Sequence, residues 1–212
     1  MAALYADDMT MREARARYFD VNGFGEDGGY NDAWVDFELG PLPLPFPNTP
    51  GRIKAVKFHD LHHVLTGYET NALGEFEISA WEIGAGCTSI AAAWVINMSG
   101  LATGVLVEPR RIFAAFMRGR RSRTLYSETF EPLLDCKVGE LRERFVDDSA
   151  AAATARSRAD VLRFVATALL GAVIGLTFAA AMLPFVPFGL LRRVLSSSAK
   201  QSALQKTPPT PK

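Results

Sequence analysis

The feature that most constrains this chain is an uncharged, strongly apolar run near its carboxyl end. Residues 164–191 contain no Asp, Glu, Lys or Arg and consist mainly of Leu, Ala, Val and Phe. Such a run is typical of a transmembrane helix, since about 20 apolar residues cross the hydrocarbon core of a bilayer. As one straight helix its 28 residues would measure about 42 Å, longer than the roughly 30 Å of hydrocarbon. We therefore expect a tilt or a break, with Pro184 and Pro187 as the place of the break.

The transmembrane segment is expected to comprise residues 161–193. A buried core helix is the alternative, but helices of globular proteins usually carry a polar face and this segment has none. Gly171 and Gly175 form a GxxxG pattern, which allows a second helix to approach closely, as in a homodimer, but small residues are also common in transmembrane segments without such a partner. Basic residues flank the segment on both sides, so the positive-inside rule does not fix its orientation. We expect a single-pass membrane protein whose globular domain is cytoplasmic.

The rest of the chain divides into segments of different composition. Residues 1–50 begin with a short helix, for which Thr10 and Glu13 form a capping-box pattern, and continue into a Gly- and Pro-rich arm that suits neither a helix nor a central strand. Residues 51–150 show the apolar spacing of several helices and no strand-like alternation. Residues 194–212, which end in TPPTPK, are typical of a disordered tail. We expect an all-α protein, a helical globular domain with a C-terminal transmembrane helix.

The charge balance argues against nucleic acid as a partner. The chain has 23 basic and 23 acidic side chains, so no overall field attracts a polyanion. Arginines do cluster between Arg110 and Arg123, interleaved with apolar residues. A helix of this kind either lies on an anionic membrane surface or presents an ordinary solvated face. The two cysteines, Cys87 and Cys136, have no CxxC partner, and we interpret them as reduced core residues.

All three histidines of the chain, His59, His62 and His63, lie within one predicted helix. This helix should begin around residues 48–50, where a capping residue precedes a proline, and end at Gly67. His59 and His63 are four residues apart, so their imidazoles share one face of the helix, as in many helical metal sites. His62 projects elsewhere, either as a residue that supports the site or as a surface residue.

Two carboxylates complete a candidate metal site. Asp60, three residues before His63, neighbours the histidine pair, and Glu75 follows a glycine-containing turn on a second predicted helix that begins near Ala72. Two imidazoles and two carboxylates are ligands that both zinc and iron accept. We therefore predict that His59, Asp60, His63 and Glu75 bind a divalent metal and are the catalytic residues of any reaction there. The alternative is that they are polar residues of an exposed helix face.

The pattern around these residues resembles that of a known family. His59 and Asp60, two further residues, His63, eleven residues and then Glu75 read as HDxxH-x11-E, the motif of the coenzyme Q biosynthesis protein 4 family. The surrounding residues are similar too, with FHDLHHVLTGY at 58–68 and LGE at 73–75. More faintly similar positions are Arg118-Gly119, Leu125, Pro132-Leu133 and Glu140-Leu141-Arg142. The likeness covers roughly residues 10–146, and the chain departs from the family in its Gly- and Pro-rich arm and its C-terminal apolar segment.

The resemblance implies a function in ubiquinone biosynthesis. It implies an all-helical fold, a divalent metal and a prenyl-lipid site. The reaction it implies replaces the ring C1 carboxylate of a prenylated hydroxybenzoate by a hydroxyl, which would make the chain a metal-dependent oxidative decarboxylase, a lyase acting on a prenylated aromatic lipid at the membrane. The alternative is a non-catalytic lipid-binding scaffold that organises quinone-biosynthesis enzymes as its protein partners. A metal-dependent phosphohydrolase would need further histidine ligands, and the chain has none outside residues 59–63.

Overall fold

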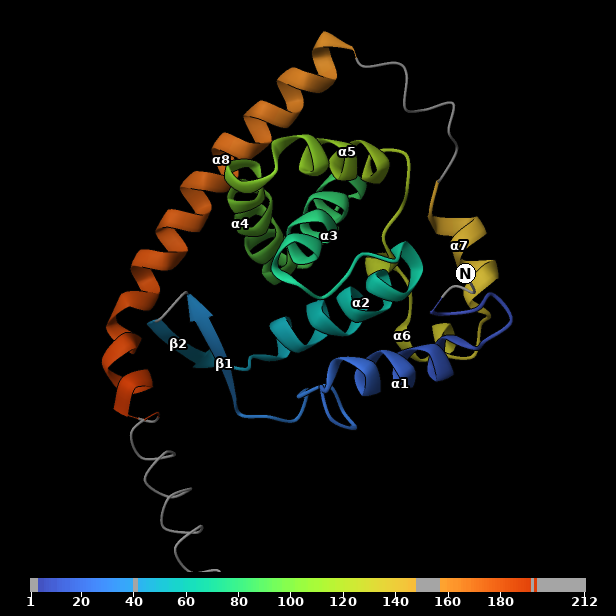
Figure 1. Ribbon diagram of the computed structural model, residues 1–212, viewed down its shortest axis with the longest axis horizontal. Coiled ribbons are helices and arrows are strands. Elements are labelled where there is room, and N and C mark those ends of the chain that lie inside the picture. Colours follow the sequence, from blue (N-terminus) through green and yellow to red (C-terminus); the bar gives the residue numbers. More distant parts are fainter. Residues whose placement is uncertain (1–3, 40–41, 148–156, 192, 194–212) are drawn as a thin grey trace, which may run out of the picture. The chain divides into compact units, whose positions relative to one another are not determined.

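Eight α-helices and one two-stranded sheet make up the computed structural model, which describes residues 4–39, 42–147, 157–191 and 193 (Figure 1). The predicted all-α class is confirmed, with one hairpin added to it. The tail predicted for residues 194–212 lies outside the described residues.

The chain divides into two compact units. One joins Met1–Asn31 with Thr49–Phe178 and contains the helical domain, and the other joins Asp32–Asn48 with Ala179–Lys212. The helix predicted near the amino terminus thus belongs to the helical unit.

The two helices that carry the predicted metal ligands begin and end where the sequence provides caps. α2 (Pro50–Thr66) starts at Thr49, whose side chain accepts a hydrogen bond from a first-turn N–H, and is followed by Gly67. The φ of 74° at Gly67 lies in the left-handed region, which glycine adopts without steric cost. α3 (Ala72–Ala85) starts at the side chain of Asn71, which caps it in the same way. Local sequence signals therefore fix the frame of the candidate site.

The other helices of the first unit surround this pair. α1 (Met11–Asn22) begins with the predicted capping box, in which Thr10 and Glu13 bond reciprocally. The remaining elements are short to medium in length. In chain order they are α4 (Ala91–Val107), α5 (Pro109–Gly119), the 3-10 turn η1 (Leu125–Ser127), α6 (Phe130–Leu133) and α7 (Val138–Phe145).

A close helix crossing in this unit joins α3 to α5 through two glycines. A Cβ atom added to Gly119 would lie 2.0 Å from the carbonyl oxygen of Trp81, and one added to Gly84 would lie 2.3 Å from that of Phe116. No side chain fits between these backbones, so only glycine permits the approach. Trp81, which is fully buried, fills the core beside the crossing.

The second unit contains a hairpin that the sequence analysis did not anticipate. The arm was expected to form neither a helix nor a central strand, and no strand was included in the all-α prediction. The structure corrects this, because β1 (Trp34–Leu39) and β2 (Leu42–Pro47) pair antiparallel with Val35 opposite Phe46. Prolines occupy every second position of β2. In a two-stranded ribbon alternate N–H groups face away from the partner strand, so prolines at those positions cost no hydrogen bond of the ladder. Within the same unit the ring of Trp34 lies 5.1 Å from that of Phe188.

The apolar C-terminal segment forms one long helical stretch, as predicted. Arg158–Leu191 is long and apolar enough to cross a membrane, and only 6% of its most apolar window is buried, whereas a soluble core helix would be mostly buried. α8 (Arg158–Met182) gives way to the 3-10 turn η3 (Leu183–Phe185), which contains Pro184. The break therefore occurs at one of the two predicted prolines.

One face of α8 packs within the first unit. The ring of Phe164 lies 5.0 Å from that of Phe113 on α5, and a Cβ atom on Gly171 would lie 2.5 Å from the carbonyl oxygen of Met98 on α4. A Cβ atom on Gly175 would lie 3.3 Å from Ser99. In this structure α4 of the same chain therefore covers the glycine face from which a homodimer was predicted, and self-association of the chain stays a prediction.

Candidate metal centre

Three of the four predicted ligands converge between α2 and the first turn of α3. Ligand atoms of His59, His63 and Glu75 all lie within 4.8 Å of one another, a group that could hold a metal ion. The two Nε2 atoms are 3.2 Å apart. The Glu75 carboxylate oxygens lie 3.2 Å from Nε2 of His59 and 3.3 Å from Nε2 of His63. The spacing of four residues on one helix thus produces the convergence that was predicted from sequence.

The hydrogen bonds at Nδ1 determine what each imidazole offers at Nε2. His63 Nδ1 lies 2.9 Å from the carbonyl oxygen of Tyr68, and His59 Nδ1 lies 2.8 Å from a carboxylate oxygen of Glu82. A carbonyl or an ionised carboxylate can only accept, so each Nδ1 carries the hydrogen and each neutral ring has its lone pair at Nε2. Two lone pairs 3.2 Å apart repel each other unless a cation or a proton lies between them. The two Nε2 atoms and the Glu75 carboxylate therefore fit a metal ion that prefers imidazole and carboxylate ligands.

The electrostatics of the group point to the same conclusion. Burial alone would lower the pKa of His59, but the Glu82 and Glu75 carboxylates outweigh it and raise this pKa well above its ordinary value. Burial likewise works against an ionised Glu75, yet the hydrogen bonds and charges of His59 and His63 lower the pKa of Glu75 to about 2. At neutral pH, a carboxylate and an imidazole that retains a proton share the group. A divalent cation would take the place of that proton.

Asp60, the fourth predicted ligand, is placed differently. Its side chain is buried, and one carboxylate oxygen accepts a hydrogen bond of 2.5 Å from the hydroxyl of Tyr30. Asp60 does not belong to the group whose ligand atoms lie within 4.8 Å of one another. Burial raises the pKa of Asp60, and the Tyr30 hydrogen bond opposes this. The structure therefore brings together His59, His63 and Glu75 and ties Asp60 to the loop that precedes β1.

His62 is neither a surface residue nor part of an exposed helix face. Its side chain is fully buried, with Nδ1 at 2.7 Å from Glu82 and Nε2 accepting a 2.9 Å hydrogen bond from the N–H of Leu125. The supporting position expected for His62 is the one observed. The alternative of an exposed helix face for the ligand residues does not fit Asp60 and His63, which are buried. Sequence reasoning missed Glu82. The signal was there, because Glu82 follows Glu75 by seven residues and so lies on the same face of α3.

The group of His59, His63 and Glu75 has one closed side and one open side. The ring of Tyr18 on α1 stacks against His63, whose side chain is only 1% exposed. On the other side the Glu75 side chain is 41% exposed. A ligand or substrate could therefore reach the group past Glu75 without displacing the core.

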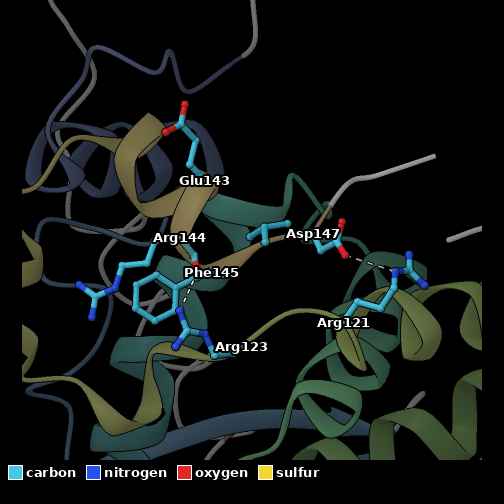
Figure 2. A pocket seen from close by; sticks show the side chains of 7 residues that line it. Arg121, Arg123, Glu143, Arg144, Phe145 and Asp147 are labelled. Carbon is cyan, nitrogen blue, oxygen red and sulfur yellow. Dashed lines mark hydrogen bonds and ion pairs between the residues drawn. The ribbon is translucent and has the colours of Figure 1, made fainter. Parts of the chain in front are cut away.

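The predicted basic stretch makes its contacts largely within the chain. Arg111 forms a two-pronged ion pair with Glu77, with N–O distances of 2.9 and 2.8 Å, and Arg118 donates to the carbonyl of Thr66. Arg121 lies 3.7 Å from Asp147 at the edge of a surface pocket. Figure 2 shows this pocket, whose lining residues are Arg121, Arg123, Glu143, Arg144, Phe145, Val146 and Asp147. Mixed charges of this kind favour a structural role for the arginines over a single-sign anion site.

Comparison of the chain with protein-family models, with curated proteins and with solved structures found no match. The fold and the site define a helical protein with a partly buried His-His-Glu group and one helix long and apolar enough to span a membrane. Membership of the coenzyme Q biosynthesis protein 4 family stays a prediction from the motif residues.

Proposed function

We propose that this chain is a membrane protein of ubiquinone biosynthesis that binds a divalent metal, zinc or iron, through His59, His63 and Glu75. The observation that carries the proposal is the opposition of two imidazole Nε2 atoms, 3.2 Å apart, on rings whose Nδ1 atoms are each bonded to an oxygen acceptor outside the group. The Asp60 carboxylate accepts a hydrogen bond from the hydroxyl of Tyr30. In this proposal Asp60 holds α2 in place and does not bind the ion.

The proposed reaction replaces the C1 carboxylate of a prenylated hydroxybenzoate by a hydroxyl. The ring carboxylate leaves as carbon dioxide and one oxygen atom is added. With dioxygen as the oxidant, two electrons from a reductant and three protons complete the balance for the ionised carboxylate, and the second oxygen atom leaves as water. A bound metal would polarise the carboxylated phenol or the oxygen. The chain itself orients the ligand nitrogens and leaves the Glu75 side open to a substrate.

The apolar helix supports a lipid substrate. Its outward face carries large exposed apolar side chains, with Leu169, Val173 and Leu176 between 62% and 72% exposed. Such a face suits hydrocarbon better than water. We propose that α8 anchors the protein, with its globular domain in the cytoplasm, in the membrane that holds the prenylated substrate. The alternative is a scaffold that binds the lipid and assembles quinone-biosynthesis enzymes without turnover.

The first experiment measures metal content. Detergent-purified wild-type protein, His63→Ala, Glu75→Ala and the control Glu131→Ala, which changes an exposed residue of α6, would be reconstituted with zinc or iron and analysed for metal. We expect about one ion per chain in the wild type and the control. The two ligand variants should lose it while their circular dichroism stays unchanged. A wild-type protein that holds no metal after reconstitution would contradict the proposal.

A second experiment separates the enzyme from the scaffold. Metal-loaded protein would be given a prenylated hydroxybenzoate labelled at the carboxyl carbon, together with dioxygen and a reductant. Release of labelled carbon dioxide that disappears in His63→Ala supports the decarboxylase. Saturable binding of the lipid without release of label supports the scaffold.

A further inference from the structure

Glu82 lies at the centre of a buried polar network behind the candidate metal centre. Its side chain is completely buried. Oε1 accepts hydrogen bonds from Nδ1 of His59 at 2.8 Å and from Nδ1 of His62 at 2.7 Å. Oε2 accepts from the hydroxyl of Tyr126 and from the side-chain amide of Asn97. Four donors thus surround one carboxylate, which compensates the cost of burying its charge.

The protonation of this network follows from its geometry. Nε2 of His62 accepts from the backbone N–H of Leu125, so the hydrogen of a neutral His62 must be on Nδ1, where it points at Glu82. Each of the four groups around the Glu82 carboxylate donates a hydrogen bond to it, an arrangement that suits an ionised acceptor. Glu82 is therefore an ionised acceptor, and His62 is a neutral donor to it.

The two ligand histidines consequently differ. His63 donates from Nδ1 to a neutral carbonyl, that of Tyr68, whereas His59 donates to an anion. An imidazole that donates to a carboxylate is held in one orientation and becomes a stronger base at its other nitrogen. Nε2 of His59 should therefore be the stronger metal ligand of the two histidines.

We propose that Glu82 is a positioning residue for the metal, a buried anion that turns Nε2 of His59 toward His63 and Glu75 and strengthens His59 as a ligand. This inference rests on the proposed metal site. It assigns to Glu82 a role outside the HDxxH-x11-E pattern. The competing explanation is that Glu82 only joins α2, α3, α4 and η1 in the core and has no influence on the ion.

Two variants separate these explanations. Glu82→Gln keeps the shape of the side chain and an oxygen that can accept from His59, but removes the charge. The new amide hydrogens can be accommodated, because among the described residues the side-chain oxygen of Asn97 has no hydrogen-bond partner, and it can turn toward them. Tyr126→Phe is the matched control, since it removes one hydrogen bond of Glu82 but leaves the charge and both histidine contacts.

The measurement is zinc affinity by chelator competition, with the visible spectrum of bound cobalt and the melting temperature recorded for each protein. Glu82→Gln should bind zinc about 10- to 100-fold more weakly than the wild type and shift the cobalt bands. Tyr126→Phe should melt lower but stay within about threefold of the wild-type affinity. A folded Glu82→Gln with wild-type affinity and spectrum would overturn the inference, as would equal losses of affinity in both variants.

A measurement on the wild type keeps the inference testable if Glu82→Gln does not fold. In the zinc-loaded protein the Nδ1 proton of His59 should resonate downfield of that of His63, because a carboxylate accepts it more strongly than a carbonyl does. Coincident resonances would count against Glu82 in this role. Absence of zinc from the wild type would instead refute the metal site itself, so the two failures are distinguishable.

Discussion

The phenol ring of Tyr18 stacks on the imidazole of His63, with ring centroids 5.5 Å apart and planes inclined by 25°. Tyr18 lies on α1 and is only 2% exposed, while His63 lies on α2. The stacked ring leaves His63 little freedom to rotate about its side-chain bonds. The first helix of the chain is therefore part of the wall of the candidate metal centre.

Replacement of Tyr18 tests this wall. Tyr18→Ala should lower the free energy of unfolding by about 3 kcal/mol, because a buried aromatic ring leaves a cavity, and it should weaken zinc binding by freeing His63. Tyr18→Phe retains the ring and should bind zinc like the wild type. Chelator competition and thermal unfolding check both statements. Equal zinc affinity in Tyr18→Ala and the wild type would show that stacking does not hold His63.

Metal binding should release a proton. Burial opposes a charged His59, but Glu82 and Glu75 raise its pKa well above the ordinary value, so the metal-free protein retains this proton at neutral pH. A divalent ion must displace it, and below the raised pKa the apparent affinity should fall about tenfold for each unit by which pH decreases. A pH indicator in weak buffer should record about one proton per zinc bound. Zinc uptake without proton release, at constant affinity from about pH 6 to 8, would contradict this prediction.

The glycine contact between α3 and α5 predicts a sharp contrast between two similar substitutions. Gly119→Ala would place a methyl group 2.0 Å from the carbonyl oxygen of Trp81, so the helices must separate, at a cost of about 3 kcal/mol or more. Gly67→Ala meets open space and incurs only the left-handed backbone conformation, about 1 kcal/mol. Urea unfolding of the two variants in detergent gives the comparison. Similar losses in both would mean that the helices separate easily.

Much of the site's frame could be predicted because its signals are local. Thr49 and Gly67 delimit α2 through capping and left-handed geometry, which depend on a few neighbouring residues. The convergence of His59 and His63 follows from helical periodicity alone. Glu75 lies one short turn away on the next helix, so its approach to the histidines required no knowledge of distant contacts.

The rest depended on contacts between distant parts of the chain. Asp60 lies on the predicted helix, but its hydrogen-bond partner Tyr30 is 30 residues away, and helical periodicity does not predict a hydrogen bond over that separation. The N–H that fixes the tautomer of His62 belongs to Leu125, 63 residues further on. The β hairpin was missed because proline density excludes a central strand, whereas the alternation of the prolines is compatible with a two-stranded ribbon.

The small-residue face of α8 yields a fourth prediction. Gly171→Leu would force the helix away from the backbone of α4 at Met98, so the protein should lose several degrees of thermal stability in detergent. Val173→Leu adds bulk to the exposed face of the same helix and should leave the melting temperature unchanged. Differential scanning fluorimetry compares the two. If Gly171→Leu leaves the melting temperature unchanged but abolishes a dimer, the glycines serve self-association as the sequence pattern indicated.

The contact between α8 and α4 affects how much of the helical unit would enter a membrane together with α8. α4 contains no charged residue, and Leu106 near its end is 86% exposed. Because Phe164 and Gly171 fasten α8 to the helical unit, insertion of α8 into a bilayer would draw the adjoining edge of α4 toward the lipid with it. The unit that carries the candidate metal centre would then lie partly within the leaflet, and a lipid could reach it laterally without passing through water.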